Sequence, residues 1–175
     1  MARVPTSWKG SQAGEEVLDY TLYDGQLSTT SANTALTLFD NTEAGVGIDQ
    51  SNMPIASSLP SKWQFLIKKI AVHFNDVLAS ADAENILDRG SFLLNINSRR
   101  MFSTILREAM SEKTVIPAGV TQDEQYFMGG TYELENYIHL KGGDQFNVEI
   151  ETGETAPGAS TELTVCLIGE LLRPV

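Results

Sequence analysis

The chain has 175 residues, with 23 acidic against 12 basic side chains and a formal net charge of −11, which excludes a broad basic surface for nucleic acid. Hydrophobic residues make up 42% and charged residues 20%, so the sequence predicts one ordinary globular core and not disorder or a fibre. The single cysteine excludes an internal disulfide framework, the first ten residues lack a signal-peptide core, and no apolar run reaches the roughly 18 residues of a membrane span.

Residues 1–14 form a predicted N-terminal arm, and residues 15–175 form one predicted domain. The arm mixes Pro5, Gly10 and Gly14 with Ser and Thr, a composition that cannot bury enough apolar surface to hold a structure by itself. We therefore expect a neighbouring subunit or an underlying layer to hold the arm.

The first predicted strands are short and separated by polar segments. Val17–Tyr23 alternates apolar and polar residues, Asp24-Gly25 is typical of a turn, and Thr34–Asp40 repeats the alternation. Asn41–Leu59 is a predicted linker with two glycines and a proline. A loop of this length inside a compact domain is usually functional or held against a partner.

Lys62–Phe74 is the strongest early strand and is expected at the centre of its sheet. Strict alternation predicts one face with Leu66, Ile70, Val72 and Phe74 and another with Phe65, Ile67 and Ala71. Lys68 and Lys69 are interpreted as solvated strand ends. A short helix is predicted over Asp76–Asp88, where an aspartate begins a segment rich in alanine.

The segment that follows predicts a strand and then a helix. Ser91–Asn97 is a strand with Phe92, Leu94 and Ile96 inward. Apolar residues then recur at steps of one, four and five from Met101 to Met110, which is typical of one helix face. Arg99, Arg100 and Arg107 cluster at this element, either as a solvated helix rim or as an anchor for acidic neighbours or lipid headgroups.

The C-terminal stretch from Tyr132 to Val175 predicts three strands and two turns. Tyr132–Leu140 and Phe146–Glu151 alternate on either side of the turn Lys141–Asp144, and the last strand, Leu163–Ile168, is apolar on both faces. Such a strand must lie centrally, with earlier segments paired beside it. Cys166 falls within it, as a small buried hydrophobe.

Residues that could carry chemistry are sparse. His73 and His139 belong to no paired histidine motif, so a metal site of the cupin kind is not expected. Glu133 and Glu135 share one face of a strand, but nothing in the sequence would raise the pKa of either carboxylate. We therefore expect neither an enzyme nor a cofactor. A carbohydrate-binding module would need exposed aromatic side chains, for which only Trp8 and Trp63 are candidates.

These elements predict an all-β fold: a single jelly-roll β-sandwich or barrel of about eight strands with one or two short inserted helices. Several segments also resemble a known family, the jelly-roll coat proteins of tailless icosahedral bacteriophages. They are Tyr137–Leu140, Gly142–Val148 and Leu163–Val175 at the end of the chain, with Asn52-Met53-Pro54 and Leu59-Pro60 leading into Phe65–Ile70.

The resemblance implies a viral structural protein that is found in the virion and assembled in the host cytoplasm. It implies partners in further copies of itself, in other capsid proteins and in the lipid membrane that such phages often enclose, and no sequence-specific contact with nucleic acid. The chain is long enough for one barrel where others of this lineage have two. This leaves a major coat, a small coat and a vertex (penton) protein open, with a carbohydrate-binding jelly roll as the alternative. The candidate contacts with neighbouring subunits or the membrane are Arg3, Trp8, Lys9, Arg99, Arg100 and Arg107.

Overall fold

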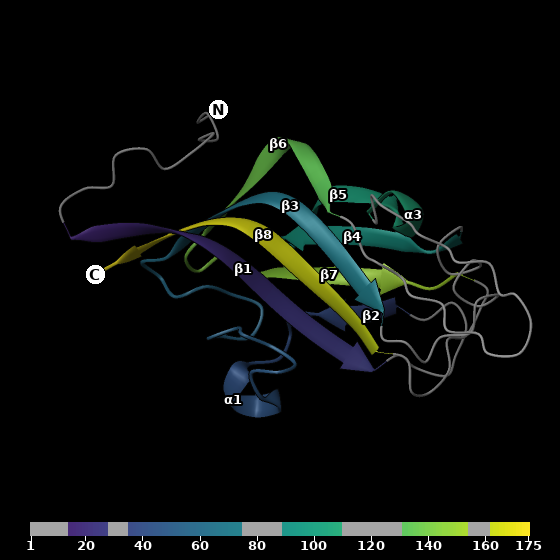
Figure 1. Cartoon of the computed structure of the whole chain (residues 1–175), viewed down its shortest axis with the longest axis horizontal. Helices are drawn as coiled ribbons and strands as arrows, with labels where there is room; N and C mark the ends of the chain where they lie inside the picture. The colour runs from purple at the N-terminus through teal and green to yellow at the C-terminus, as the bar shows by residue number, and fades with distance from the viewer. Residues whose placement is uncertain (1–13, 28–34, 75–88, 110–130, 154–161) are drawn as a thin grey trace, which may run out of the picture.

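The computed structural model of the chain describes residues 14–27, 35–74, 89–109, 131–153 and 162–175. Its elements form two layers of strands with two short helices at their margins (Figure 1). In chain order they are β1 (Glu15–Leu27), β2 (Ala35–Leu38), α1 (Glu43–Val46), β3 (Gln64–Phe74), β4 (Ser91–Ile96), β5 (Arg99–Ile105), α3 (Leu106–Ala109), β6 (Tyr132–Lys141), β7 (Phe146–Glu151) and β8 (Glu162–Pro174).

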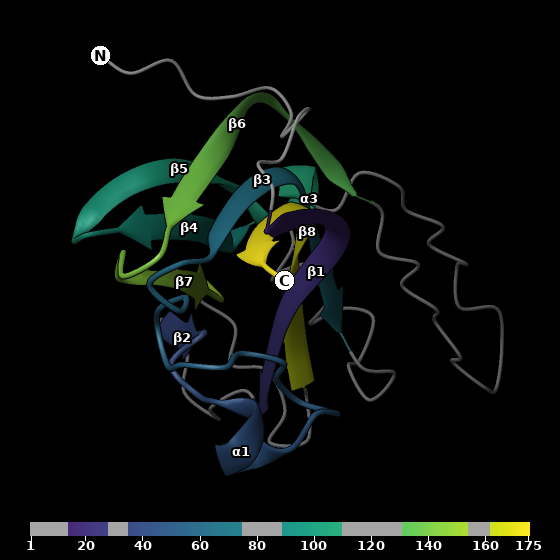
Figure 2. The ribbon, with the colours of Figure 1, turned by 90° about the vertical axis from the view of Figure 1, so that its left-hand side faces the viewer.

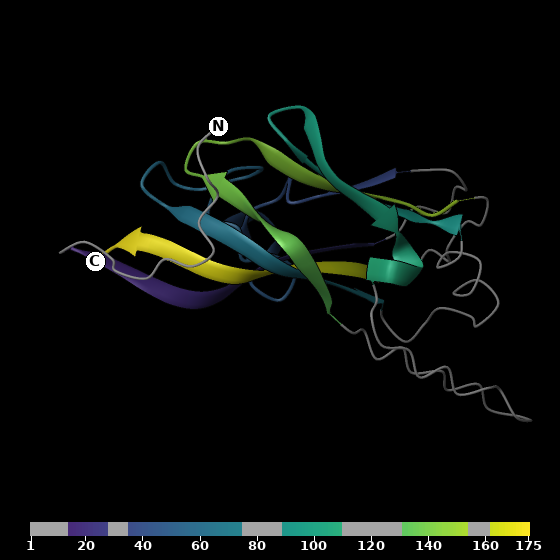
Figure 3. The same cartoon turned by 90° about the horizontal axis from the view of Figure 1, so that it is seen from above.

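The strands pair as nested antiparallel partners. β1 pairs with β8, β2 with β7, β3 with β6 and β4 with β5. The pairs fall in two sheets of four strands, sheet A in the order β1-β8-β3-β6 and sheet B in the order β2-β7-β4-β5 (Figure 3). One long antiparallel hairpin rolled into two facing layers is a jelly roll. The described part of the chain therefore confirms the predicted all-β single jelly roll with short inserted helices.

The core lies between the two sheets and takes buried side chains from every described strand except β5, whose partly buried Phe102 packs against it. Alternation places Phe92, Leu94 and Ile96 of β4 inward, as predicted. From β7 and β8 the inward residues are Phe146, Val148, Ile150, Leu163, Val165, Leu167 and Leu171. Because β8 pairs with β1 on one side and β3 on the other, the prediction of a central last strand is confirmed.

The predicted turn at Asp24-Gly25 was wrong, because β1 continues through it to Leu27. The reason is a close approach by another segment. The Gly25 N–H donates to the carbonyl of Gln50 at 2.8 Å, and a Cβ on Gly25 would lie 2.9 Å from the hydroxyl of Thr164. Glycine is therefore needed here for space within a strand and not for a reversal of the chain.

The predicted faces of β3 were correct only on one side of a bulge. Register against both neighbouring strands shifts between Ile67 and Lys69. The extra residue, Lys68, reverses the alternation, so the core receives Phe65 and Ile67 before the bulge and Ile70 and Val72 after it. The sequence pattern had grouped Ile70 with Leu66, which is buried but lies outside the core cluster.

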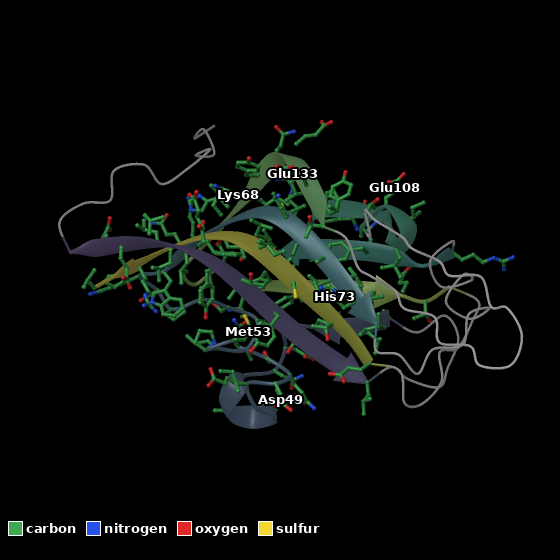
Figure 4. All side chains as sticks on the ribbon, in the orientation of Figure 1. Asp49, Met53, Lys68, His73, Glu108 and Glu133 are labelled. Carbon is green, nitrogen blue, oxygen red and sulfur yellow. The ribbon has the colours of Figure 1, made fainter. Side chains whose placement is uncertain are left out.

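The bulge also changes the role of Lys68. The prediction that Lys68 is a solvated strand end was wrong, because its ammonium forms an ion pair with Glu170 on β8. The same ammonium lies 5.6 Å from the ring centroid of Tyr137 on β6. Figure 4 labels Lys68 where β3 and β6 bend.

The predicted helix over residues 101–110 was mostly wrong. Arg99–Ile105 is β5, and only Leu106–Ala109 is helical. β5 is the last strand of sheet B, so it exposes Met101 and Ile105, and their four-residue spacing resembled a helical face. A register shift opposite Leu94 and Asn95 further breaks the alternation that would have identified a strand.

Two predictions concern residues outside those described: most of the N-terminal arm, and the short helix over Asp76–Asp88. The junction of the arm with the domain is described, and there the N–H of Val175 donates to the carbonyl of Gly14 at 3.0 Å. The linker from Asn41 to Leu59 is described as well and contains α1.

Candidate functional site

The outer surface of sheet B is a polar face built by alternation. Residues that point away from the core on β7 and β4 include Asn147, Glu149 and Asn95, and register places Asn147 beside Asn95. The amide of Asn95 donates to Asn147 Oδ1 at 3.1 Å and to Glu149 Oε1 at 3.0 Å. A shallow hollow of about 500 Å³ lies over this array, lined by Ser57, Asn95, Ser98, Arg100, Gln145, Phe146, Asn147 and Glu149.

A tight hairpin fixes the basic residues beside this hollow. Asn97 and Ser98 join β4 to β5 with φ of 50° and 60°, as the two-residue hairpin of right-handed twist requires. Asn97 also donates through its amide to Asp144 Oδ1 at 2.9 Å and accepts from the Gln145 N–H at 3.0 Å. The hairpin tip is thereby joined to the β6–β7 turn, and Arg99 and Arg100 follow it directly.

A second hollow lies between the two sheets at one side of the sandwich. We call it the edge groove: a cavity of about 420 Å³ lined by Met101 and Phe102 of β5 and by Tyr132, Leu134, Glu135, Asn136, Tyr137, Ile138 and His139 of β6. β5 and β6 are the terminal strands of sheets B and A on the same side of the molecule (Figure 2). Its floor is aromatic, with the rings of Phe102 and Tyr132 5.4 Å apart and those of Phe102 and Phe92 6.1 Å apart.

The two strands that border the edge groove carry opposite charges. Arg99 and Arg100 are exposed on β5, and Glu133 and Glu135 are exposed on β6. Within the residues that the structure describes, none of these four side chains has an ion-pair partner. We call Arg99 and Arg100 the basic lip and Glu133 and Glu135 the acidic lip.

The two histidines that the sequence offered as candidate metal ligands lie far apart. His73 and His139 both project from the outer face of sheet A, because their neighbours Val72, Ile138 and Leu140 point into the core. His139 pairs with Leu66 in register, which is seven residues from His73 and so roughly 20 Å away along β3. His139 contacts Gln64 Oε1 through Nε2 at 3.0 Å, and burial together with nearby Lys141 lowers the pKa of its imidazole. No group of three metal-ligating side chains occurs in the described ranges.

One buried carboxylate stands apart from both hollows. Asp24 is fully buried on β1, and its Oδ2 accepts from the Phe39 N–H at 2.6 Å. Phe39 has a φ of 70°, a left-handed conformation that few non-glycine residues adopt, so Asp24 stabilises an unusual backbone turn after β2. Asp24 Oδ1 has no hydrogen-bond partner among described atoms, and burial raises the pKa of the carboxyl.

The predicted contact residues divide into three groups. Arg99 and Arg100 lie together on a strand at the basic lip, where a helix had been expected. Arg107 belongs to α3, although its side chain is not described, and Arg3, Trp8 and Lys9 lie outside the described residues. Sequence reasoning noted the acidic pair Glu133 and Glu135, but the fold was needed to place this pair and the two arginines on the two strands that border the edge groove.

Comparison with known proteins adds no relative. No protein-family model matches the sequence, and no curated protein is significantly similar to it. Among the described residues, none of the helices has the length and apolar character needed to cross a bilayer.

Proposed function

We propose that the chain is a coat subunit of an icosahedral viral shell, a single-jelly-roll protein that assembles through repeated lateral contacts with copies of itself and with other capsid proteins. The observation that carries the proposal is the nested strand order of two four-stranded sheets. Jelly rolls serve chiefly as capsid subunits, lectin-like modules and cupins. The cupin chemistry is disfavoured because His139 on β6 is paired with Leu66, seven residues and so roughly 20 Å from His73 along β3.

The edge of the sandwich also supports a role in assembly. Met101 and Ile105 are large apolar residues with 48% and 45% of their surface exposed, both on the terminal strand of sheet B. Exposed apolar residues on an unpaired edge strand mark an interaction surface or an aggregation hazard. Neighbouring subunits in a shell would cover these residues and so remove that hazard.

The test is assembly of the purified protein. Sedimentation velocity at rising concentration, with negative-stain microscopy of the fastest species, should show rings or shells. Each contact in such an assembly is expected to bury above roughly 1,000 Å². A protein that stays monomeric at high concentration, in its native salt and with any coat partner added, would count against the proposal. The size and symmetry of the assembled particle would distinguish a major or small coat protein from a vertex protein.

A carbohydrate-binding module is the second candidate, favoured by the polar hollow on sheet B. Its amide, hydroxyl, carboxylate and guanidinium groups match the hydrogen-bonding needs of sugar hydroxyls. An exposed aromatic platform is not part of this hollow, since its one aromatic side chain, Phe146, is buried in the core. Trp63 is half-buried beneath Arg173, whose guanidinium lies 5.8 Å from the ring.

A glycan array distinguishes the two functions. Binding of one glycan class that is lost in Asn147→Ala and retained in Asp49→Ala would favour the module, because Asp49 is exposed near α1 and away from sheet B (Figure 4). Shells that form equally well from the Asn147→Ala protein would favour the coat subunit.

A further inference from the structure

The two edges of the sandwich differ in how the chain covers them. On the side of β1, the segment around Asn52 covers the edge of sheet A through backbone and side-chain hydrogen bonds. Asn52 Oδ1 accepts from the Tyr23 N–H at 2.9 Å, its amide donates to the carbonyl of Thr21 at 2.7 Å, and its own N–H donates to the carbonyl of Tyr23 at 3.2 Å. The edge of sheet A at β1 is therefore covered by another segment of the same chain.

On the side of the edge groove, the described residues provide no comparable cover. Among the described strands, β5 pairs with β4 alone and β6 with β3 alone. An unpaired strand is a template for association, and natural proteins block it when association is harmful. Figure 2 shows the contrast, with α1 and its neighbouring loops at the opposite side of the molecule from β5 and β6.

The bordering strands are shaped so that a partner cannot simply add another strand. β6 pairs with β3 through Glu133 and again through Ile138, and the four residues between them stand opposite Lys68 alone. This part of β6 arches away from β3 (Figure 1). β5 has its own irregularity at Met101, opposite the step from Leu94 to Asn95. Bulges disrupt the regular ladder that strand addition needs, so an occupant would dock through side chains.

The charges of the two lips indicate which occupant fits. A protein with a net charge of −11 repels its own copies, so contacts between copies need local complementarity. A two-fold axis through the edge groove would place the basic lip of each copy against the acidic lip of the other. The same axis would bury the exposed Met101 of each copy against the groove of its partner.

We propose that the edge groove is a two-fold interface between copies of this chain, with Arg99 and Arg100 of β5 in one copy contacting Glu133 and Glu135 of β6 in the other. The inference rests on the proposed coat function and deepens it, by naming the surface and the residues through which two subunits meet. Met101 is the apolar residue at the centre of the contact, and the four charged residues set its geometry.

The test is a charge-swap cycle measured by sedimentation equilibrium on the full chain. The basic-lip variant is Arg99→Glu with Arg100→Glu, the acidic-lip variant is Glu133→Arg with Glu135→Arg, and the third protein combines all four changes. Each lip variant should weaken association at least tenfold, because like charges then face each other. The combined variant should return to within about threefold of the wild type, since complementarity is restored with the charges exchanged.

The cycle separates a specific contact from general repulsion. The two lip variants change the net charge by the same amount in opposite directions. If only overall charge mattered, the acidic-lip variant would associate more tightly than the wild type, and that result would overturn the proposal. Equal association of all four proteins would overturn it as well. The changed side chains are exposed, and matching circular dichroism spectra and melting temperatures would exclude misfolding as the cause of any loss.

Matched apolar variants test the centre of the contact. Met101→Glu should weaken association, and Ile48→Glu should not, although Ile48 is more exposed at 64% and lies next to α1.

If shells form from both lip variants, the interface is wrong and the coat function stands. If the wild type forms dimers but never shells, and association is lost in each lip variant and restored in the combined variant, the interface stands and the coat function is wrong. A wild type that remains monomeric would overturn both.

Discussion

Asp24 illustrates how one residue can matter more than its place in the sequence suggests. Its carboxylate joins β1 to the left-handed Phe39 after β2, across the gap between the two sheets. The unpartnered Oδ1 and the surrounding burial disfavour the charged form, and the pKa of the carboxyl is raised as a result. The carboxylate of Asp24 therefore binds a proton more tightly in the folded chain than in the unfolded chain.

The pH dependence of stability should report this residue. Since the folded pKa lies above the unfolded one, the stabilisation is fully present below the unfolded pKa and is lost as the pH rises through the folded pKa. We expect the free energy of unfolding of the wild type to fall, relative to that of Asp24→Asn, as the pH rises from about 4, the ordinary aspartate range, to neutral pH. Urea unfolding at both pH values measures the difference. Asp49→Asn, an exposed control, should run parallel to the wild type, and parallel curves for Asp24→Asn would refute the assignment.

At the scale of elements, the bulge in β3 determines the shape of sheet A. Lys68 inserts one residue, reverses which side chains reach the core, and leaves β6 to arch over the edge groove. Gly169 on β8 makes this possible, because the backbone of Leu66 passes so close that a Cβ on Gly169 would overlap the Leu66 carbonyl oxygen. The bulge and the glycine form one structural unit.

Gly169→Ala should therefore be costly. Displacing the backbone of a central strand is expected to lower the free energy of unfolding by about 2 kcal/mol or more, as overpacking in cores does. Denaturant unfolding followed by circular dichroism measures the loss. Gly45→Ala is the matched control, since a Cβ there meets only the Thr42 hydroxyl at 3.4 Å, and its stability should be unchanged or slightly higher. An equal effect of the two substitutions would show that the close approach at Gly169 is unimportant.

At the scale of the whole molecule, the nested pairing unites both ends of the chain. β1 pairs with β8 along the full length of both strands, from Glu15 opposite Pro174 to Leu27 opposite Glu162. The core draws on both sheets as one cluster, so neither sheet buries its inner face without the other. Most contacts join residues distant in sequence, which predicts slow folding for a domain of this size.

Unfolding should accordingly be a single cooperative transition. In a Trp8→Phe background, the fluorescence of Trp63 reports on the start of β3, and far-UV circular dichroism reports on both sheets. The two denaturation curves should coincide at protein concentrations where the chain is monomeric. Separate midpoints would indicate that sheet A and sheet B unfold as independent units, which the shared core does not allow.

The sequence alone determined the elements whose alternation is regular: the C-terminal strands with Phe146, Val148 and Val165 inward, the strand from Ser91, and the all-β class. Period-two patterning is a local property and can be read wherever a strand is half-buried and unbroken.

The tertiary structure alone decided the features where that pattern fails. The bulge at Lys68 depends on Gly169 in a strand one hundred residues later, and Gly25 is explained by a loop that returns to β1. The strand β5 looked helical because a terminal strand exposes both faces in part. The edge groove could not have been foreseen, since the two strands that border it come from different sheets and only the rolling of the hairpin brings β5 and β6 to the same side of the molecule.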